Sequence, residues 1–366
     1  MFIFFAILVF GMIIFVHELG HYLAARKAGI RVVEFSIGMG PRLLKFTRGE
    51  TMYSLKLFPI GGSCRMLGDE DKEEGAEPDP RSFNSKSVPW RMLVILGGGI
   101  ANFLFALVLA ILISMFNVQQ DRYIMSFPEN SPAQAAGLLE GDRVIRVNGR
   151  RIATRGDVNF AMLSADGRPI DIRVNRDGQR LDFTLNPMYR AEENRWLLGI
   201  SFGVSVGTFA NAPEGYQDAP GWRRMGFFEN FAVGANTVDF YIRATLTGLG
   251  RLIRYGFNFD EIMGPIGIVG TVGGDVTYVL EAEGGGVGPA FWTLMQWTAI
   301  LSATLGMMNL LPIPALDGAH MVFLAIEGIR RKPIPPERQG MINLIGFVLL
   351  MGLFVIVAYH DILRFF

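Results

Sequence analysis

Four long apolar stretches constrain this chain of 366 residues more strongly than any other feature of its sequence. They cover residues 2–25, 92–116, 290–326 and 341–359. A helix of about 20 apolar residues crosses a bilayer core, so the first, second and fourth stretches each predict one membrane span. The third would form a helix of about 55 Å, too long for one straight span. We expect it to break at Pro312 and Pro314, because proline lacks an amide donor and clashes with the preceding turn.

The composition excludes a disordered chain and disfavours an ordinary soluble enzyme. Half of the residues are hydrophobic and only 19% are charged. The 34 basic and 34 acidic residues cancel, so no global charge argues for nucleic acid as a partner. The single cysteine, Cys64, cannot form an internal disulfide and supplies no pair of thiolates for a metal.

Basic residues beside the apolar stretches predict their orientation. A signal peptide carries its positive charge before the apolar segment, whereas Arg26, Lys27 and Arg31 follow the first stretch here. We therefore interpret that stretch as a retained span. Basic residues are also frequent through 26–91 and in the link at 330–338, which predicts that both segments are cytoplasmic. Four crossings then place both termini outside the cytoplasm.

A separate folded domain is predicted between the second and third stretches, at 118–212. Its composition is that of a soluble domain, and about ninety residues suffice for an independent core. The predicted elements are a short helix at 131–138, a strand at 143–147, a turn at Asn148-Gly149, and a hairpin of 170–174 with 181–185 around Asp177-Gly178.

The first stretch contains the sequence His17-Glu18-Leu19-Gly20-His21. In a helix, the two histidines lie four residues apart on one face and can bind one Zn²⁺. Glu18 can act as the general base on a water molecule whose pKa the metal lowers to about 7. Ionisable groups at membrane depth are costly and are functional by default.

A catalytic zinc usually has three protein ligands, and Asp317 is the best candidate for the third. It lies just past the expected helix break, where a buried carboxylate needs a counter-charge. The alternative is that Asp317 merely caps the helix that restarts at Gly318. His320 and His360 lie in no convincing ligand pattern, and we interpret both as structural or interfacial.

These motifs resemble the site-2 protease family of intramembrane zinc metalloproteases, in particular the bacterial regulator of sigma-E protease type. The resemblance covers nearly the whole chain and includes a single PDZ-like domain at 118–212. The residues that carry it are His17-Glu18-x-x-His21, Phe35 to Pro41, Pro59 to Gly62, Phe83-Asn84-x-Lys86-Ser87-Val88, Ala101-Asn102-Phe103, Gly264-Pro265-Ile266 and Asn309-x-x-Pro312-x-Pro314-x-Leu316-Asp317-Gly318. The chain departs from the family pattern at Gly97 to Gly99, Ser63 and Ala319, none of which is a candidate ligand.

The resemblance implies roles for the motif residues. His17, His21 and Asp317 would hold one Zn²⁺ per chain, and Glu18 would be the catalytic base. Asn309, together with Pro312 and Pro314, would position the substrate near the metal. Implied substrates are single-span membrane proteins already trimmed by an upstream protease, such as anti-sigma factors, or remnant signal peptides. The PDZ-like domain would bind peptide C-termini or exclude bulky substrates.

Two further segments allow alternative interpretations. Alternation through 33–58 around Thr47 to Glu50 predicts a hairpin, which is either membrane-associated beside the site, as in the family, or a cytoplasmic surface hairpin. Apolar spacing through 227–257 predicts an amphipathic helix that lies on the outer interface or packs against the external domain. The acidic run 69–79 predicts a solvated loop, and Gly97 to Gly99 predict close helix packing.

The predicted fold is therefore a polytopic α-helical membrane protein with four transmembrane helices, an inserted membrane-associated β-hairpin and one extracytoplasmic PDZ-like α+β domain. Its predicted segments are a first span at 1–28, the hairpin and loop at 29–89, a second span at 90–117, the PDZ-like domain at 118–212, an amphipathic interfacial region at 213–288, a broken third span at 289–327, a cytoplasmic loop at 328–340 and a fourth span at 341–363.

The leading functional hypothesis is an intramembrane zinc endopeptidase of the bacterial cytoplasmic membrane, with the lipid bilayer and membrane proteins as partners and no nucleic acid. A non-catalytic scaffold that binds peptides through the PDZ-like domain and uses the metal structurally is the main alternative. The intact Glu18 disfavours it, because a structural site needs no base. A metal transporter is disfavoured because few polar residues lie in the other spans.

Overall fold

A computed structural model describes most of the chain. The described residues are 2–68, 79–117, 119–120, 122–152, 157–158, 160–161, 167–190, 195–202, 222–223, 226–256, 263–282 and 285–365. Most of the acidic run at 69–79, and the end of the predicted domain at 203–212, lie outside them. The chain divides into two compact units. We call Met1–Ala106, Leu252–Tyr278 and Thr293–Phe366 the helical unit, and Leu107–Arg251 and Val279–Trp292 the β unit.

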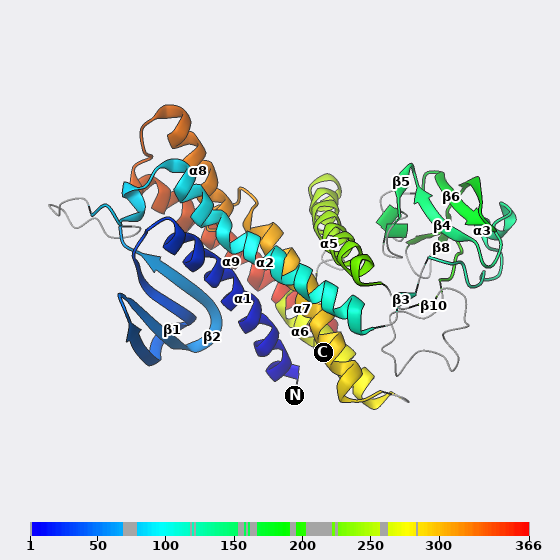
Figure 1. Ribbon diagram of the computed structural model, residues 1–366, viewed down its shortest axis with the longest axis horizontal. Coiled ribbons are helices and arrows are strands. Elements are labelled where there is room, and N and C mark those ends of the chain that lie inside the picture. The colour runs from blue at the N-terminus through cyan, green and yellow to red at the C-terminus, as the bar shows by residue number, and fades with distance from the viewer. Residues whose placement is uncertain are drawn as a thin grey trace. The chain divides into compact units, whose positions relative to one another are not determined.

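The helical unit is built from long helices that run beside one another (Figure 1). They are α1 (Phe2–Lys27), the first part of α2 (Val88–Phe116), α6 (Pro265–Glu281), most of α7 (Val287–Asn309), α8 (Asp317–Arg330) and α9 (Pro336–Phe365). Among the described residues, three helices are long and apolar enough to span a membrane: Phe4–Lys27, Val88–Phe116 and Pro336–Arg364. The third apolar stretch is divided between α7 and α8.

The predicted break in this third stretch is confirmed. The helix α7 ends at Asn309 and α8 begins at Asp317, with both prolines in the turn between them. Ala315 in this turn has a φ of 73°, in the left-handed region. Its amide donates to Oδ1 of Asn343 on α9 at 3.3 Å. The prolines thus stop one helix, and the turn that follows presents Asp317 at the start of the next.

Glycines allow α1 and α2 to approach closely, as the sequence predicts for Gly97. A Cβ atom on Gly97 would lie 2.6 Å from the carbonyl oxygen of Gly20. A Cβ atom on Gly20 would lie 2.6 Å from Cβ of Ala101. Contacts this short exclude any larger side chain unless the helices move apart, which is the usual way small residues bring membrane helices together.

A long hairpin packs beside α1 (Figure 1). It consists of β1 (Val32–Arg48) and β2 (Thr51–Met66), with the turn at Gly49 and Glu50. The predicted hairpin ended at residue 58, whereas β2 continues for eight residues more. Both strands bend, so four short segments lie side by side in the order 62–66, 32–37, 51–55 and 44–48. Beyond residue 58 the strand contains Gly61 and Gly62, which weaken the alternating pattern by which strands are predicted.

The β unit contains a four-stranded sheet in the order β5-β4-β6-β7. The strands are β4 (Arg143–Val147), β5 (Arg150–Arg151), β6 (Ile170–Arg176) and β7 (Gln179–Leu185). Both predicted turns are present, and all four of their residues have positive φ, as type I′ hairpin turns require: Asn148 47°, Gly149 76°, Asp177 49° and Gly178 86°. The predicted short helix is α3 (Pro132–Ala135), and Gly137 follows it with a φ of 94°.

Other elements complete this unit. They are β3 (Gln119–Gln120), β8 (Met188–Arg190), β9 (Arg195–Leu197), β10 (Trp222–Arg223) and most of α5 (Phe227–Tyr255), besides the short η1 (Phe83–Ser85) of the helical unit. On α5, Nη2 of Arg243 donates to Oδ1 of Asp157 at 2.6 Å. The rings of Phe160 and Phe240 also meet, with centroids 6.2 Å apart. These contacts favour packing against the domain over an isolated position on the membrane interface.

Candidate metal centre

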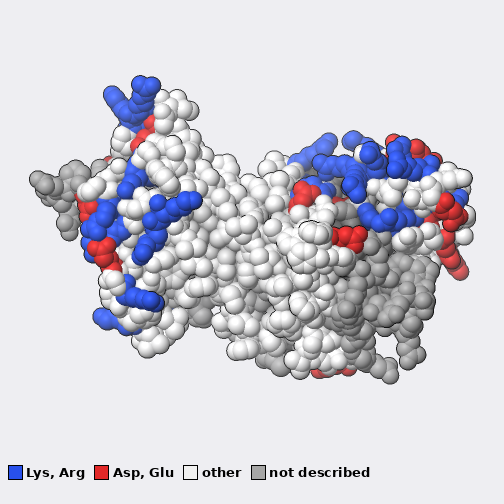
Figure 2. All heavy atoms as spheres, viewed as in Figure 1, with Lys and Arg blue, Asp and Glu red and all other residues white. Residues whose placement is uncertain are grey.

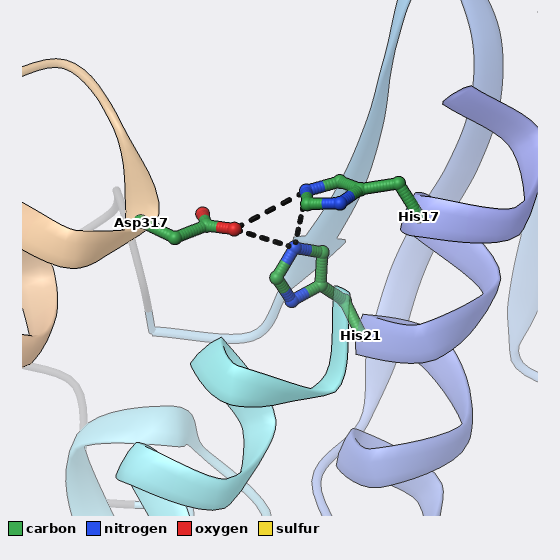
Figure 3. Close-up of side chains that lie close together, drawn as sticks. All are labelled: His17, His21 and Asp317. Atoms are coloured by element: carbon green, nitrogen blue, oxygen red, sulfur yellow. Dashed lines mark hydrogen bonds and ion pairs between the residues drawn. The ribbon is translucent and has the colours of Figure 1, made fainter. Parts of the chain in front are cut away.

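Three ionisable side chains from distant parts of the sequence converge within the helical unit (Figure 3). His17 and His21 lie one turn apart on α1, and Asp317 opens α8. Nε2 of His17 lies 3.1 Å from Nε2 of His21. Oδ2 of Asp317 lies 3.2 Å from the first nitrogen and 3.3 Å from the second. The three atoms therefore form a nearly equilateral triangle.

The triangle has the size expected of three ligands around one zinc ion. Zinc lies about 2.0–2.1 Å from nitrogen and oxygen ligands in a tetrahedron, which places neighbouring ligand atoms about 3.3 Å apart. Oδ2 of Asp317 is buried and has no hydrogen-bond partner among the described residues. His17 and His21 are only 8% and 9% exposed. A buried carboxylate oxygen facing two imidazole nitrogens is satisfied by a cation, and the donor set suits zinc.

The ring nitrogen of His21 that faces away from the triangle is occupied. Nδ1 of His21 lies 2.9 Å from the carbonyl oxygen of Val94 on α2. A carbonyl oxygen only accepts, so Nδ1 carries the proton and donates it. Nε2 of His21 is then unprotonated and has its lone pair free for a metal.

Asp317 does not act as a simple helix cap. The cap residue of α8 is Leu316, and no side chain caps this helix N-terminus. The carboxylate of Asp317 is directed instead toward the histidines (Figure 3). On α2, Arg91 forms an ion pair with Glu327 of α8, which ties the helix that follows Asp317 to the bundle.

The other predicted residues lie at different distances from this cluster. Glu18 is half-buried beside β2, where a Cβ atom on Gly62 would lie 2.7 Å from its Cγ. Nδ2 of Asn309 lies 3.3 Å from Nε2 of His17, at the edge of the triangle. Pro312 and Pro314 shape the turn and contribute no donor. Nε2 of His320 lies 3.3 Å from Nδ2 of Asn343 and belongs to no metal cluster among the described residues.

A buried carboxylate holds the hairpin beside the site together. Glu34 is 3% exposed and accepts hydrogen bonds from Nε and Nη2 of Arg42, each at 2.8 Å, and from Oγ of Ser54 at 2.6 Å. The Arg42 guanidinium lowers the pKa of Glu34 from 4.5 to about 2. The hairpin segment nearest Glu18 pairs with the strand that carries Glu34, so this ion pair supports the wall of the site.

Asn102 and Gly98 of α2 also face the histidines. From the sequence, Gly98 is expected only to allow close helix packing, and Asn102 is given no role. Asn102 is fully buried, and its Nδ2 lies 3.3 Å from Nδ1 of His17. A Cβ atom on Gly98 would lie 2.5 Å from Nε2 of His21 and 2.8 Å from Nε2 of His17. An amide in the middle of an apolar span was the available signal, because polar groups at that depth are costly.

Known proteins similar to this chain support the metal centre. The family model described as Peptidase family M50 matches residues 5–353. The zinc metalloprotease RasP of Geobacillus kaustophilus is 31% identical over 438 aligned positions, which cover 98% of this chain and 97% of the relative. The regulator of sigma-W protease RasP of Bacillus subtilis is 29% identical, with 98% of each chain covered. Both relatives are bacterial proteases. The apolar helices of this chain and its triad that fits zinc are consistent with both relatives. The chain belongs to peptidase family M50, the site-2 protease family, and is a zinc metalloprotease.

Proposed function

We propose that this metalloprotease cleaves peptide bonds within the membrane-spanning segments of other proteins, with His17, His21 and Asp317 as the zinc ligands and Glu18 as the general base. The observation that carries the proposal is the position of the triad. Two of its members lie inside the apolar span Phe4–Lys27, and all three are largely buried. Their cost at membrane depth is offset only if they bind a cation there.

The chain's own residues supply the proton transfers. When bound, zinc lowers the pKa of a water molecule and polarises the scissile carbonyl. Glu18 takes the proton released as this water attacks the carbonyl carbon and passes it to the nitrogen of the leaving segment, so that the C–N bond breaks without a free amide anion. The amide of Asn309, at the edge of the triangle, donates to a substrate carbonyl and holds it over the ligands.

The hairpin is the proposed docking edge for an unwound substrate. Its segment at 62–66 is one of the two outer segments and is the one beside Glu18, and the Cys64 backbone hydrogen-bonds to the Glu18 carboxylate. An extended peptide added at this edge would pass the base. Seven large apolar side chains of the hairpin are 42% to 67% exposed: Met39, Leu43, Leu44, Phe46, Leu55, Leu57 and Phe58. Such a surface favours a membrane-associated hairpin over a cytoplasmic one.

We propose four crossings of the bacterial cytoplasmic membrane, with α7 as the crossing beside the three apolar spans. Lys and Arg side chains gather at the end of the helical unit where the hairpin and α8 lie, and a zone without charge follows (Figure 2). The positive-inside rule makes that end cytoplasmic and places both termini and the PDZ-like domain outside. Phe2→Cys and Phe365→Cys, each combined with Cys64→Ala, are labelled from outside intact cells to test this topology, and protection of either cysteine contradicts it.

The proposed substrates are single-span proteins shortened by an upstream protease, such as anti-sigma factors, or remnant signal peptides. In the β unit, a cavity of about 350 Å³ is lined by residues 126–129, Ser131, Met188, Arg190 and 197–201. It offers a place for a newly exposed peptide end on a domain that otherwise screens substrates by size. Deleting residues 123–190 should remove the preference for trimmed over intact substrate, and an unchanged preference would exclude this role.

One experiment tests the catalytic proposal directly. The parent protein and Glu18→Gln are purified in detergent, zinc is measured, and cleavage of a tagged single-span substrate is followed. Glu18→Gln should keep one zinc per chain and lose about 10²–10⁴-fold in cleavage rate, because it cannot accept the proton. Asp317→Ala should lower zinc content. A Glu18→Gln protein that binds zinc and cleaves at the parental rate contradicts the role of Glu18, and parental zinc affinity in Asp317→Ala contradicts the ligand set.

A further inference from the structure

One stripe of α2 faces the two histidines of α1. Val94, Gly98 and Asn102 are spaced four residues apart and therefore lie above one another on one face of the helix. The Val94 carbonyl meets His21, Gly98 lies against the edges of both rings, and Asn102 meets His17. The stripe thus repeats the spacing of the histidines themselves, so that each imidazole has one contact from α2 on its Nδ1 side.

The two contacts differ in one respect. Nδ1 of His21 meets an oxygen atom, which can only accept. Nδ1 of His17 meets the amide nitrogen of Asn102, which can only donate. For Nε2 of His17 to bind a metal, its Nδ1 must carry the proton, and two donors would then face each other at 3.3 Å.

The remaining amide atom of Asn102 resolves this conflict. Oδ1 of Asn102 is buried and has no hydrogen-bond partner among the described residues. A rotation of the amide by 180° exchanges Oδ1 and Nδ2 and requires no other movement. Nδ1 of His17 then donates to Oδ1 of Asn102, and the two histidines have the same arrangement.

We infer that Asn102 is a positioning residue for the zinc site, accepting the Nδ1 proton of His17 through its side-chain oxygen and so directing Nε2 of His17 to the metal. This inference rests on the proposed ligand role of His17. Side chains that hold a ligating histidine through its second nitrogen fix its tautomer and orientation, and their loss lowers metal affinity about 10–100-fold. Asn102 has no contact with the substrate in this role.

The backbone of the same residue supplies a matched control. Oγ of Ser302 on α7 donates to the Asn102 carbonyl oxygen at 3.0 Å. Ser302→Ala removes this link between α7 and α2 but leaves the amide facing His17. A role for Asn102 that is only structural, in joining the helices, would make Ser302→Ala resemble the loss of the side chain.

The test measures zinc affinity of the full-length protein in detergent by competition with a chelator. Asn102→Leu, which is apolar and of similar size, should bind zinc about 10–100-fold more weakly. Asn102→Asp keeps an acceptor in the same place and should hold zinc within about threefold of the parent. Ser302→Ala should match the parent.

Three outcomes would overturn the inference: parental affinity in Asn102→Leu, equal losses in Asn102→Leu and Asn102→Asp, or an equal loss in Ser302→Ala. If Asn102→Leu does not fold, Asn102→Ala takes its place, because it also removes the acceptor and should likewise bind zinc about 10–100-fold more weakly. The catalytic proposal fails separately. Glu18→Gln that cleaves normally contradicts the role of Glu18 while leaving the zinc affinities of the Asn102 variants unaffected.

Discussion

The helical unit and the β unit bury different kinds of side chain. Of the eleven largest fully buried side chains among the described residues, eight belong to the β unit: Ile124, Leu138, Val144, Val147, Ile170, Ile172, Leu185 and Leu198. The helical unit contributes Ile13, Val32 and Val94 and leaves most large apolar side chains of α9 exposed, as lipid-facing helices do. The helical unit has an apolar cluster around Ala25, Ile30, Val94 and Leu324, but its helices also meet through glycines and buried polar links. Burial of apolar surface therefore contributes to both units, and in the helical unit the close approach of the helices contributes as well.

Gly98→Ala should produce the largest effect on zinc binding, and it tests directly whether the helical unit depends on the close approach of α2 to the histidines. The added methyl group would lie 2.5 Å from Nε2 of His21 and 2.8 Å from Nε2 of His17. Because zinc ligands lie about 2 Å from the ion, the methyl group enters the coordination sphere, and zinc affinity should fall about 100-fold or more. Zinc content and cleavage are measured on the purified protein.

Gly11→Ala on α1 is the matched control, because a Cβ atom there meets nothing within 4 Å. It should keep both zinc and activity. If Gly98→Ala bound zinc as tightly as the parent, α2 would lie farther from the histidines than the structure shows, and close approach would not be what the helical unit depends on.

Ile172→Ala should affect the β unit alone. Ile172 is 1% exposed and lies in the core of the four-stranded sheet. Replacing a buried isoleucine by alanine lowers the free energy of unfolding by about 2–5 kcal/mol, so hydrogen exchange in residues 122–202 should accelerate strongly. Zinc content should remain one per chain. Loss of zinc in this variant would contradict the separation of the two units, and Leu139→Ala, at a position of the β unit that is 52% exposed, should leave exchange unchanged.

The features of the fold that follow from a local rule could be predicted from the sequence. The two type I′ turns of the sheet depend on residues that tolerate positive φ, and the break before Asp317 depends on two prolines, so each could be located from a few neighbouring residues. The pairing of His17 with His21 follows from helical spacing in the same way.

The remaining features depend on contacts between distant segments. Asn102 lies 85 residues from His17, and nothing beside it in the sequence names that partner. The extension of β2 beyond residue 58 depends on the pairing of 62–66 with 32–37 and not on local alternation. Asp361 is another example, since it accepts hydrogen bonds from the amides of Gly264 and Gly267 at the start of α6. Such links are decided by how the helices pack.

The smallest expected effect concerns the hairpin, where the buried carboxylate of Glu34 forms an ion pair with the partly exposed guanidinium of Arg42. The folded pKa of Glu34 is about 2, below its usual 4.5, because Arg42 hydrogen-bonds to its charged form. A lowered carboxyl pKa contributes stability that is fully present above pH 4.5 and is lost as the pH falls toward 2. The protection factors of residues 32–58 in hydrogen exchange, which correct for the intrinsic pH dependence of amide exchange, should therefore fall as the pH is lowered through this window in the parent protein. Glu34→Gln, which cannot ionise, should show faster exchange at pH 6 and a much flatter pH dependence. Comparing parent with variant cancels the titration of the histidines, and identical pH profiles for the two would show that the Glu34–Arg42 pair does not stabilise the hairpin.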